Sequence, residues 1–152
     1  MQYQTEYEGT HVKVLFELEQ VEGGYTPEKW ESLWALPLED NTFKIDNIPF
    51  YVPRLSCDDI VKARKSGDEY LFEAVNEHSK NSTIRMIIYD VDEIENIRER
   101  LVTFGCEVEK SGTLGFIALN IPVTAKIEEL MAYLKNGHDA DLWDYEEASL
   151  RF

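Results

Sequence analysis

Alternation of apolar and polar residues in the first half of the chain predicts β-strands. In residues 11–20, Val14, Phe16 and Leu18 share one face, and charged residues dominate the other. This period of two is typical of a strand that is buried on one side. Residues 69–75 have the composition of a further strand.

The densest apolar stretch, residues 30–52, predicts a hairpin followed by a corner. Residues 30–38 and 42–45 are strand-like, and the intervening Glu39-Asp40-Asn41 has turn composition. We expect this stretch to form the core of a small β-rich module.

Short segments between these strands predict the turns and loops of the first half of the chain. Residues 1–10 read as a loose lead-in, Gly23-Gly24 as a turn and residues 25–27 as an extended piece. Ser56 and Asp59 approximate a capping box, which predicts one helical turn leading into a strand. Residues 1–80 are therefore predicted to form a small β-barrel-like or bent-sheet module.

The pattern changes after a polar linker at residues 76–81. Residues 83–89 are a nearly continuous apolar run, as in a strand covered on both faces. Asp90 and Glu93 resemble a helix start, and Gly105 sits where a C-terminal cap belongs. Between them lies one apolar helical stripe, formed by Ile94, Ile97, Leu101 and Phe104.

The remaining residues predict two strands, a helix and a last strand. The strands fall at residues 106–109 and 114–121, and the last one at 142–150. Thr124 is expected to cap the second helix and Gly137 to end it. The order β-α-β-β-α-β predicts a ferredoxin-like sandwich for residues 81–152, so the fold class is α+β with two modules.

Five segments together resemble a family of uncharacterised bacterial domains: VKVLFELE, WESLWALPL, IDNIPFYV, STIRMIIYD and WDYEEASL. The resemblance spans nearly the whole chain. It carries no catalytic residues over. By analogy, small acidic members of such families suit the role of immunity proteins beside secreted toxins.

The net charge of the chain indicates which classes of partner it can bind. The chain has 15 basic and 30 acidic residues, a net charge of −15. Residues 1–80 carry 8 basic and 16 acidic side chains (−8) and residues 81–152 carry 7 and 14 (−7), so the acidity is spread evenly. This distribution argues against nucleic-acid binding and against an anionic membrane surface, and it permits a basic protein partner. Acidity for solubility alone is the other interpretation.

We expect a cytoplasmic location. The polar N-terminus lacks a secretory signal pattern, and no apolar run approaches the length of a membrane helix. Cys57 and Cys106 lack metal-ligand spacing, and we expect two packed, reduced thiols.

Catalytic and metal motifs are weak. His78, Ser79, Ser82 and Arg85 are close in sequence, but no strained Ser turn of the G-x-S-x-G type surrounds either Ser. In GHDAD, His138, Asp139 and Asp141 offer ligands without the EF-hand spacing. We therefore expect neither an enzyme, nor a metal, nor a cofactor, and a hydrolase built on His78, Ser82 and Arg85 is the form to test.

Two aromatic groups remain. The first group packs in a core or lines a stacking groove, and it comprises Trp30, Trp34, Phe43, Phe50 and Tyr51. The second lies in the acidic segment 139–147, which reads either as a protected edge strand or as a patch that binds a partner. The predicted partner-binding residues are Asp139, Asp141, Trp143, Asp144, Tyr145, Glu146 and Glu147.

The first functional hypothesis is a non-enzymatic, acidic binding protein. Its concrete form is an immunity or antitoxin-like inhibitor that covers the active site of a basic toxin, such as a nuclease. The alternative is a small-molecule-sensing or regulatory ferredoxin-like module, which the same edge strands would allow to form a homodimer.

Overall fold

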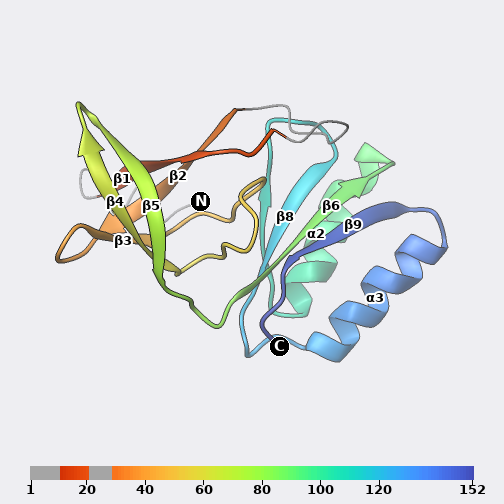
Figure 1. Ribbon diagram of the computed structural model, residues 1–152. Helices are drawn as coiled ribbons and strands as arrows, with labels where there is room; N and C mark the ends of the chain where they lie inside the picture. The colour runs from red at the N-terminus through yellow and green to blue at the C-terminus, as the bar shows by residue number, and fades with distance from the viewer. Residues whose placement is uncertain (1–10, 21–28) are drawn as a thin grey trace. The chain divides into compact units, whose positions relative to one another are not determined.

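The computed structural model describes residues 11–20 and 29–152 (Figure 1). The chain divides into two compact units, Met1–Ser79 and Lys80–Phe152. The first unit is built from strands and the second from strands and helices, so the α+β class is confirmed. The predicted lead-in at 1–10, the turn at Gly23-Gly24 and the extended piece at 25–27 lie outside the described residues.

The first unit is a closed barrel in the order β1-β2-β3-β4-β5. Neighbouring strands are antiparallel, and β1 closes the barrel by pairing with β5 in parallel. Closure gives these strands a partner on both sides. The strands are β1 (Val12–Glu17), β2 (Trp30–Pro37), β3 (Thr42–Ile45), β4 (Ile60–Ser66) and β5 (Glu69–Glu77).

Alternating side chains fill the barrel as the period-two pattern predicts. Val14 and Phe16 from β1 and Ala35 from β2 are buried in one apolar cluster. Phe16 also stacks on Phe72 of β5, with ring centroids 4.6 Å apart.

The register of β2 divides the first aromatic group. Trp30 is 47% exposed and Phe43 is buried, so the group as a whole is not core. The inward position next to Trp30 is Glu31, whose carboxylate accepts hydrogen bonds from the backbone N–H groups of Phe50, Tyr51 and Val52. A buried acid thus holds the predicted corner by satisfying three donors.

The predicted helical turn after Ser56 is wrong. Residues 57–58 form a turn in which Asp58 has a φ of 69°, outside the helical region. The Asp59 carboxylate does accept the Ser56 N–H, but it also accepts the Ser79 N–H. Asp59 therefore ties two loops of the barrel unit together instead of starting a helix.

The second unit is a four-stranded antiparallel sheet in the order β7-β8-β6-β9, with helices packed on one face (Figure 1). Its core joins Met86 and Leu119 of the sheet to Leu101 and Leu130 of the helices. The elements are β6 (Ser82–Ile88), the 3₁₀ helix η1 (Val91–Glu93), α2 (Ile94–Thr103), β7 (Glu107–Lys110), β8 (Phe116–Ile121), α3 (Ile127–Asp139) and β9 (Trp143–Ser149).

The observed ends of α2 agree with those predicted from the sequence, whereas the observed ends of α3 differ from the prediction. Asp90 accepts the Asp92 N–H at the start of η1, and Gly105 follows α2 with a φ of +97°. In contrast, α3 begins at Ile127, and no side chain caps it, so the assignment of Thr124 is wrong. Gly137 lies inside α3 and is buried. No helix in the described part of the chain is long and apolar enough to cross a membrane.

Candidate partner-binding surface

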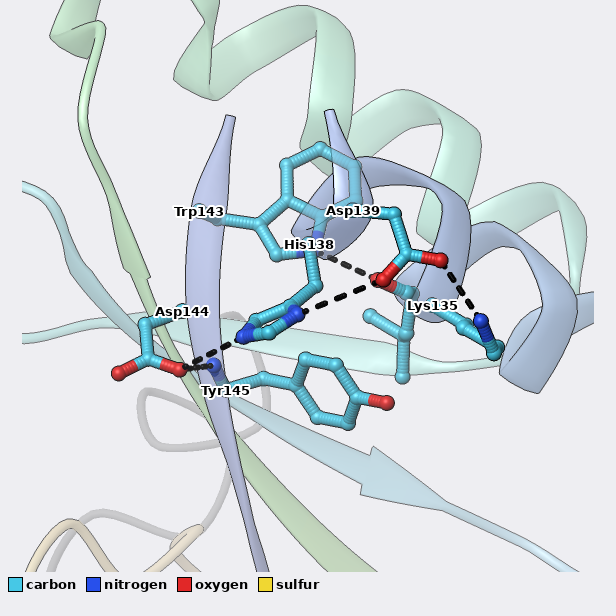
Figure 2. Close-up of polar contacts among 7 residues, drawn as sticks. Lys135, His138, Asp139, Trp143, Asp144 and Tyr145 are labelled. Carbon is cyan, nitrogen blue, oxygen red and sulfur yellow. Dashed lines mark hydrogen bonds and ion pairs between the residues drawn. The ribbon is translucent and has the colours of Figure 1, made fainter. Parts of the chain in front are cut away.

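The packing of Trp143 against Gly137 fixes the start of the acidic segment. The indole ring of Trp143 lies over Gly137, where a Cβ would overlap it. Its Nε1 donates to the Leu134 carbonyl, 3.0 Å away (Figure 2). Trp143 is only 2% exposed, which corrects its assignment as a partner contact. It instead holds β9 against the last turn of α3.

The turn between α3 and β9 presents Asp141 to solvent. The N–H of Asp141 bonds to the His138 carbonyl, and the N–H of Leu142 bonds to the Gly137 carbonyl. Asp141 has a φ of 61°, a left-handed conformation that Asp tolerates better than most residues. These bonds end the helix two residues later than the sequence predicted and leave the Asp141 side chain exposed.

Asp139 and Asp144 lie on either side of His138. Its ring nitrogens are 3.8 Å from Asp139 Oδ1 and 3.6 Å from Asp144 Oδ1 (Figure 2). The imidazole also meets the Tyr145 ring edge-on, with centroids 5.8 Å apart. The geometry therefore gathers three of the predicted residues around one exposed histidine.

Lys135 neutralises part of this cluster. It donates to Asp139 Oδ2 across one helical turn, at 2.6 Å. This hydrogen bond lowers the pKa of the Asp139 carboxyl and raises the pKa of the Lys135 ammonium. Both groups are exposed, so solvent and salt screen the pair.

Along β9 the side chains alternate between the two faces of the sheet. Tyr145 packs against the helix-side core, whereas Glu146 pairs with Arg85 of β6 at 3.3 Å. The register shifts between Thr83 and Arg85, so β9 carries an extra residue there, next to the exposed Glu147. Bulges and acidic residues are typical protections of a sheet edge.

The structure thus exposes the five predicted acids, whereas both aromatics of the segment pack on the helix-side core. All five acids are exposed, namely Asp139, Asp141, Asp144, Glu146 and Glu147. We name them the acidic segment surface. Sequence reasoning missed two cations that pair with it, Lys135 and Arg85. The i,i+4 spacing of Lys135 and Asp139 was a readable signal, whereas the contact of Arg85 with Glu146 depends on strand register.

The contacts described for the hydrolase candidates lie within each unit. His78 Nδ1 is 3.5 Å from the buried Asp59, and the Ser79 hydroxyl donates to the Cys57 carbonyl. Ser82 Oγ accepts the Arg151 N–H, and Arg85 pairs with Glu146. Each of these contacts has a structural role in its own unit.

Two further features of the described residues bear on ligand binding. Among residues 11–20 and 29–152, no three His, Cys, Asp or Glu side chains come together as metal ligands would. An open depression in the barrel unit is lined in part by Leu38, Asp40, Thr42 and Lys62, none of them a predicted site residue.

Fold and surface together define a two-unit α+β protein with an exposed acidic segment on an edge strand. The chain belongs to the family described as domain of unknown function DUF4265, whose model matches residues 31–145. This match confirms the resemblance found in the sequence. No curated protein matches the chain.

One solved structure is similar over nearly the whole length. It is the crystal structure of a hypothetical protein from Neisseria gonorrhoeae, with 24% sequence identity and a TM-score of 0.73. The match covers 93% of this chain and 96% of that chain. At this level of identity the likeness shows the fold alone.

Proposed function

We propose that this protein is a non-enzymatic binding protein whose acidic segment surface engages a basic protein. The observation that carries the proposal is the fixed exposure of its acids: Trp143 is buried on Gly137, while Asp141, Asp144 and Glu147 point to solvent. Because Trp143 packs the start of β9 against α3, this part of the backbone loses little conformational freedom on binding.

The concrete form of the proposal is an immunity or antitoxin-like inhibitor of a basic bacterial toxin. A nuclease site is built to hold phosphates, so carboxylates at fixed spacing can occupy the same positions. Opposite charge also speeds the encounter of inhibitor and toxin. The net charge of −15 supports this form.

Two finer assignments belong to the same proposal. The strand order β7-β8-β6-β9, with antiparallel neighbours and helices on one face, supports a ferredoxin-like sandwich for the second unit. The buried thiol of Cys106, which is in no disulfide, supports a cytoplasmic location, where such thiols stay reduced.

Capture from a lysate of the source organism, at low and at moderate salt, tests the proposal. The baits are the wild type, a triple variant (Asp141→Asn, Asp144→Asn, Glu147→Gln) and a matched control (Glu17→Gln, Glu19→Gln, Asp68→Asn). The control removes the same charge from exposed acids of the barrel unit. We expect one stoichiometric basic protein on the wild type and the control, released by salt and absent from the triple variant.

The inhibitor form has a second readout. If the captured protein is a nuclease, an equimolar amount of wild type should abolish its activity and the triple variant should not. A partner that binds all three baits equally would refute the acidic segment surface. A homodimer with no other partner would instead favour the regulatory module.

A further inference from the structure

Three loops of the second unit meet at one end of its sheet. They follow β6 (residues 89–93), precede β8 (111–115) and precede β9 (140–142). The backbone links them: the Tyr89 N–H donates to the Leu142 carbonyl at 3.2 Å, and the Ile88 N–H donates to the Gly115 carbonyl at 2.8 Å. These hydrogen bonds place the three loops side by side.

Gly115 allows the close approach of two of these loops. Its φ is +88°, and a Cβ there would lie 2.8 Å from the Ile88 carbonyl oxygen and 3.9 Å from Val91 Cγ1. The backbone of residue 115 therefore packs against the β6 loop, and its neighbour Leu114 is held at the surface.

The four large apolar side chains of these loops are exposed. Tyr89 is 55% exposed, Val91 40%, Leu114 77% and Leu142 52%. Single exposed apolar residues are ordinary, but four on loops joined by hydrogen bonds form a patch, and such patches mark interaction sites. We name these four residues the apolar end.

The charged residues within these three loops are all acidic. Exposed Asp90, Asp92 and Asp141 belong to the same loops. Residues 89–93, 111–115 and 140–142 contain no Lys, Arg or His. An apolar centre with an acidic rim complements a segment in which apolar side chains are flanked by Lys or Arg. A second copy of this chain would bring acids against acids.

We propose that the apolar end is the anchor point for a basic partner protein, and that it binds an apolar side chain flanked by lysines or arginines. The inference rests on the proposed function for the existence of a basic partner. Leu142 lies between Asp141 and Asp144 in sequence, so the anchor is continuous with the acidic segment surface. The acids would set the rate of association, and the apolar end would hold the complex together.

Fluorescence anisotropy with labelled synthetic peptides tests this anchor. The probe peptide carries a Trp-Leu pair flanked by lysines; one control peptide has Ser in place of the pair, and another has Glu in place of the lysines. The protein variants are Leu114→Ser/Leu142→Ser and a matched Val102→Ser/Val123→Ser. Val102 and Val123 are also exposed apolar residues, 48% and 56%, and lie on α2 and beyond the opposite end of β8.

We expect the wild type to bind the probe peptide and to discriminate against both control peptides. Leu114→Ser/Leu142→Ser should weaken binding by about tenfold, and Val102→Ser/Val123→Ser by less than about twofold. Backbone amide shifts in the ¹⁵N-labelled protein should move at residues 89–91, 114 and 142 when the probe peptide is added.

Several results would overturn the anchor. One is equal binding of the probe peptide and of the control peptide with Ser in place of the Trp-Leu pair, with both lost in the Asp141→Asn/Asp144→Asn/Glu147→Gln variant. The acidic segment surface would then be the whole site, and the proposed function would stand. Absence of peptide binding would also overturn the anchor. So would self-association that Leu114→Ser/Leu142→Ser removes, because the occupant would then be a second copy.

Discussion

Gly137 illustrates how one residue can be misread when its long-range partner is unknown. A glycine after an apolar stripe usually ends a helix, and here it continues one. The reason is Trp143, whose ring occupies the space where a side chain at residue 137 would lie. The same contact buries the tryptophan that the sequence suggested as a surface anchor.

Gly137→Ala should therefore destabilise the protein although alanine favours helices. The helix propensity gain is about 1 kcal/mol, and forcing a methyl group against the Trp143 ring costs about 1–3 kcal/mol or more. Urea unfolding followed by tryptophan fluorescence measures the net loss. Gly112→Ala is the control, because nothing lies within 4 Å of the added Cβ. A stabilised Gly137→Ala protein would contradict the packing described.

Cys106 gives a pH-dependent prediction at the same scale. Burial raises the pKa of its thiol from 9.0 to about 12, since the thiolate would lose its solvation. The unfolded chain therefore ionises first as pH rises, and the thiol's contribution to stability is complete below pH 9 and lost between pH 9 and 12. The free-energy difference between wild type and Cys106→Ala should shrink across this window in urea titrations. A constant difference would contradict the burial.

Among the elements, those defined by local signals were predicted well. The apolar stripe of α2 and its Gly105 end need only neighbouring residues, and both are confirmed. The failures are two predicted helix starts. Thr124 and Ser56 look like caps, but α3 starts at Ile127, and Asp58 leaves helical backbone geometry.

The turn between β2 and β3 contains a residue whose substitution should stabilise the protein. Asp40 and Asn41 both have positive φ, 59° and 57°, as in a hairpin turn of type I′. Glycine is preferred at the second position, so Asn41→Gly should raise the free energy of unfolding by about 0.5–1 kcal/mol. Asn41→Val, which disfavours positive φ, should lower it. Thermal unfolding of both variants measures the effect, and equal melting temperatures would argue against this turn.

At the scale of the whole molecule, the sequence predicts the class better than the site. Strand alternation and two apolar stripes were enough for an α+β chain. The acids of segment 139–147 were found from composition, but their pairing with Arg85 and the burial of Trp143 depend on strand register and packing. The apolar end was missed because Tyr89 and Leu114 fall within predicted strands and become exposed only where those strands end.

The salt dependence of partner affinity tests the central claim most directly. Calorimetric titration at increasing NaCl measures the Kd of the captured basic protein. The proteins compared are the wild type, the Asp141→Asn/Asp144→Asn/Glu147→Gln variant and the Glu17→Gln/Glu19→Gln/Asp68→Asn control. We predict that Kd rises steeply with salt for the wild type and the control, and that the triple variant binds at least about tenfold more weakly at low salt with a flatter salt dependence. Equal Kd values and equal salt slopes for all three proteins would contradict the account.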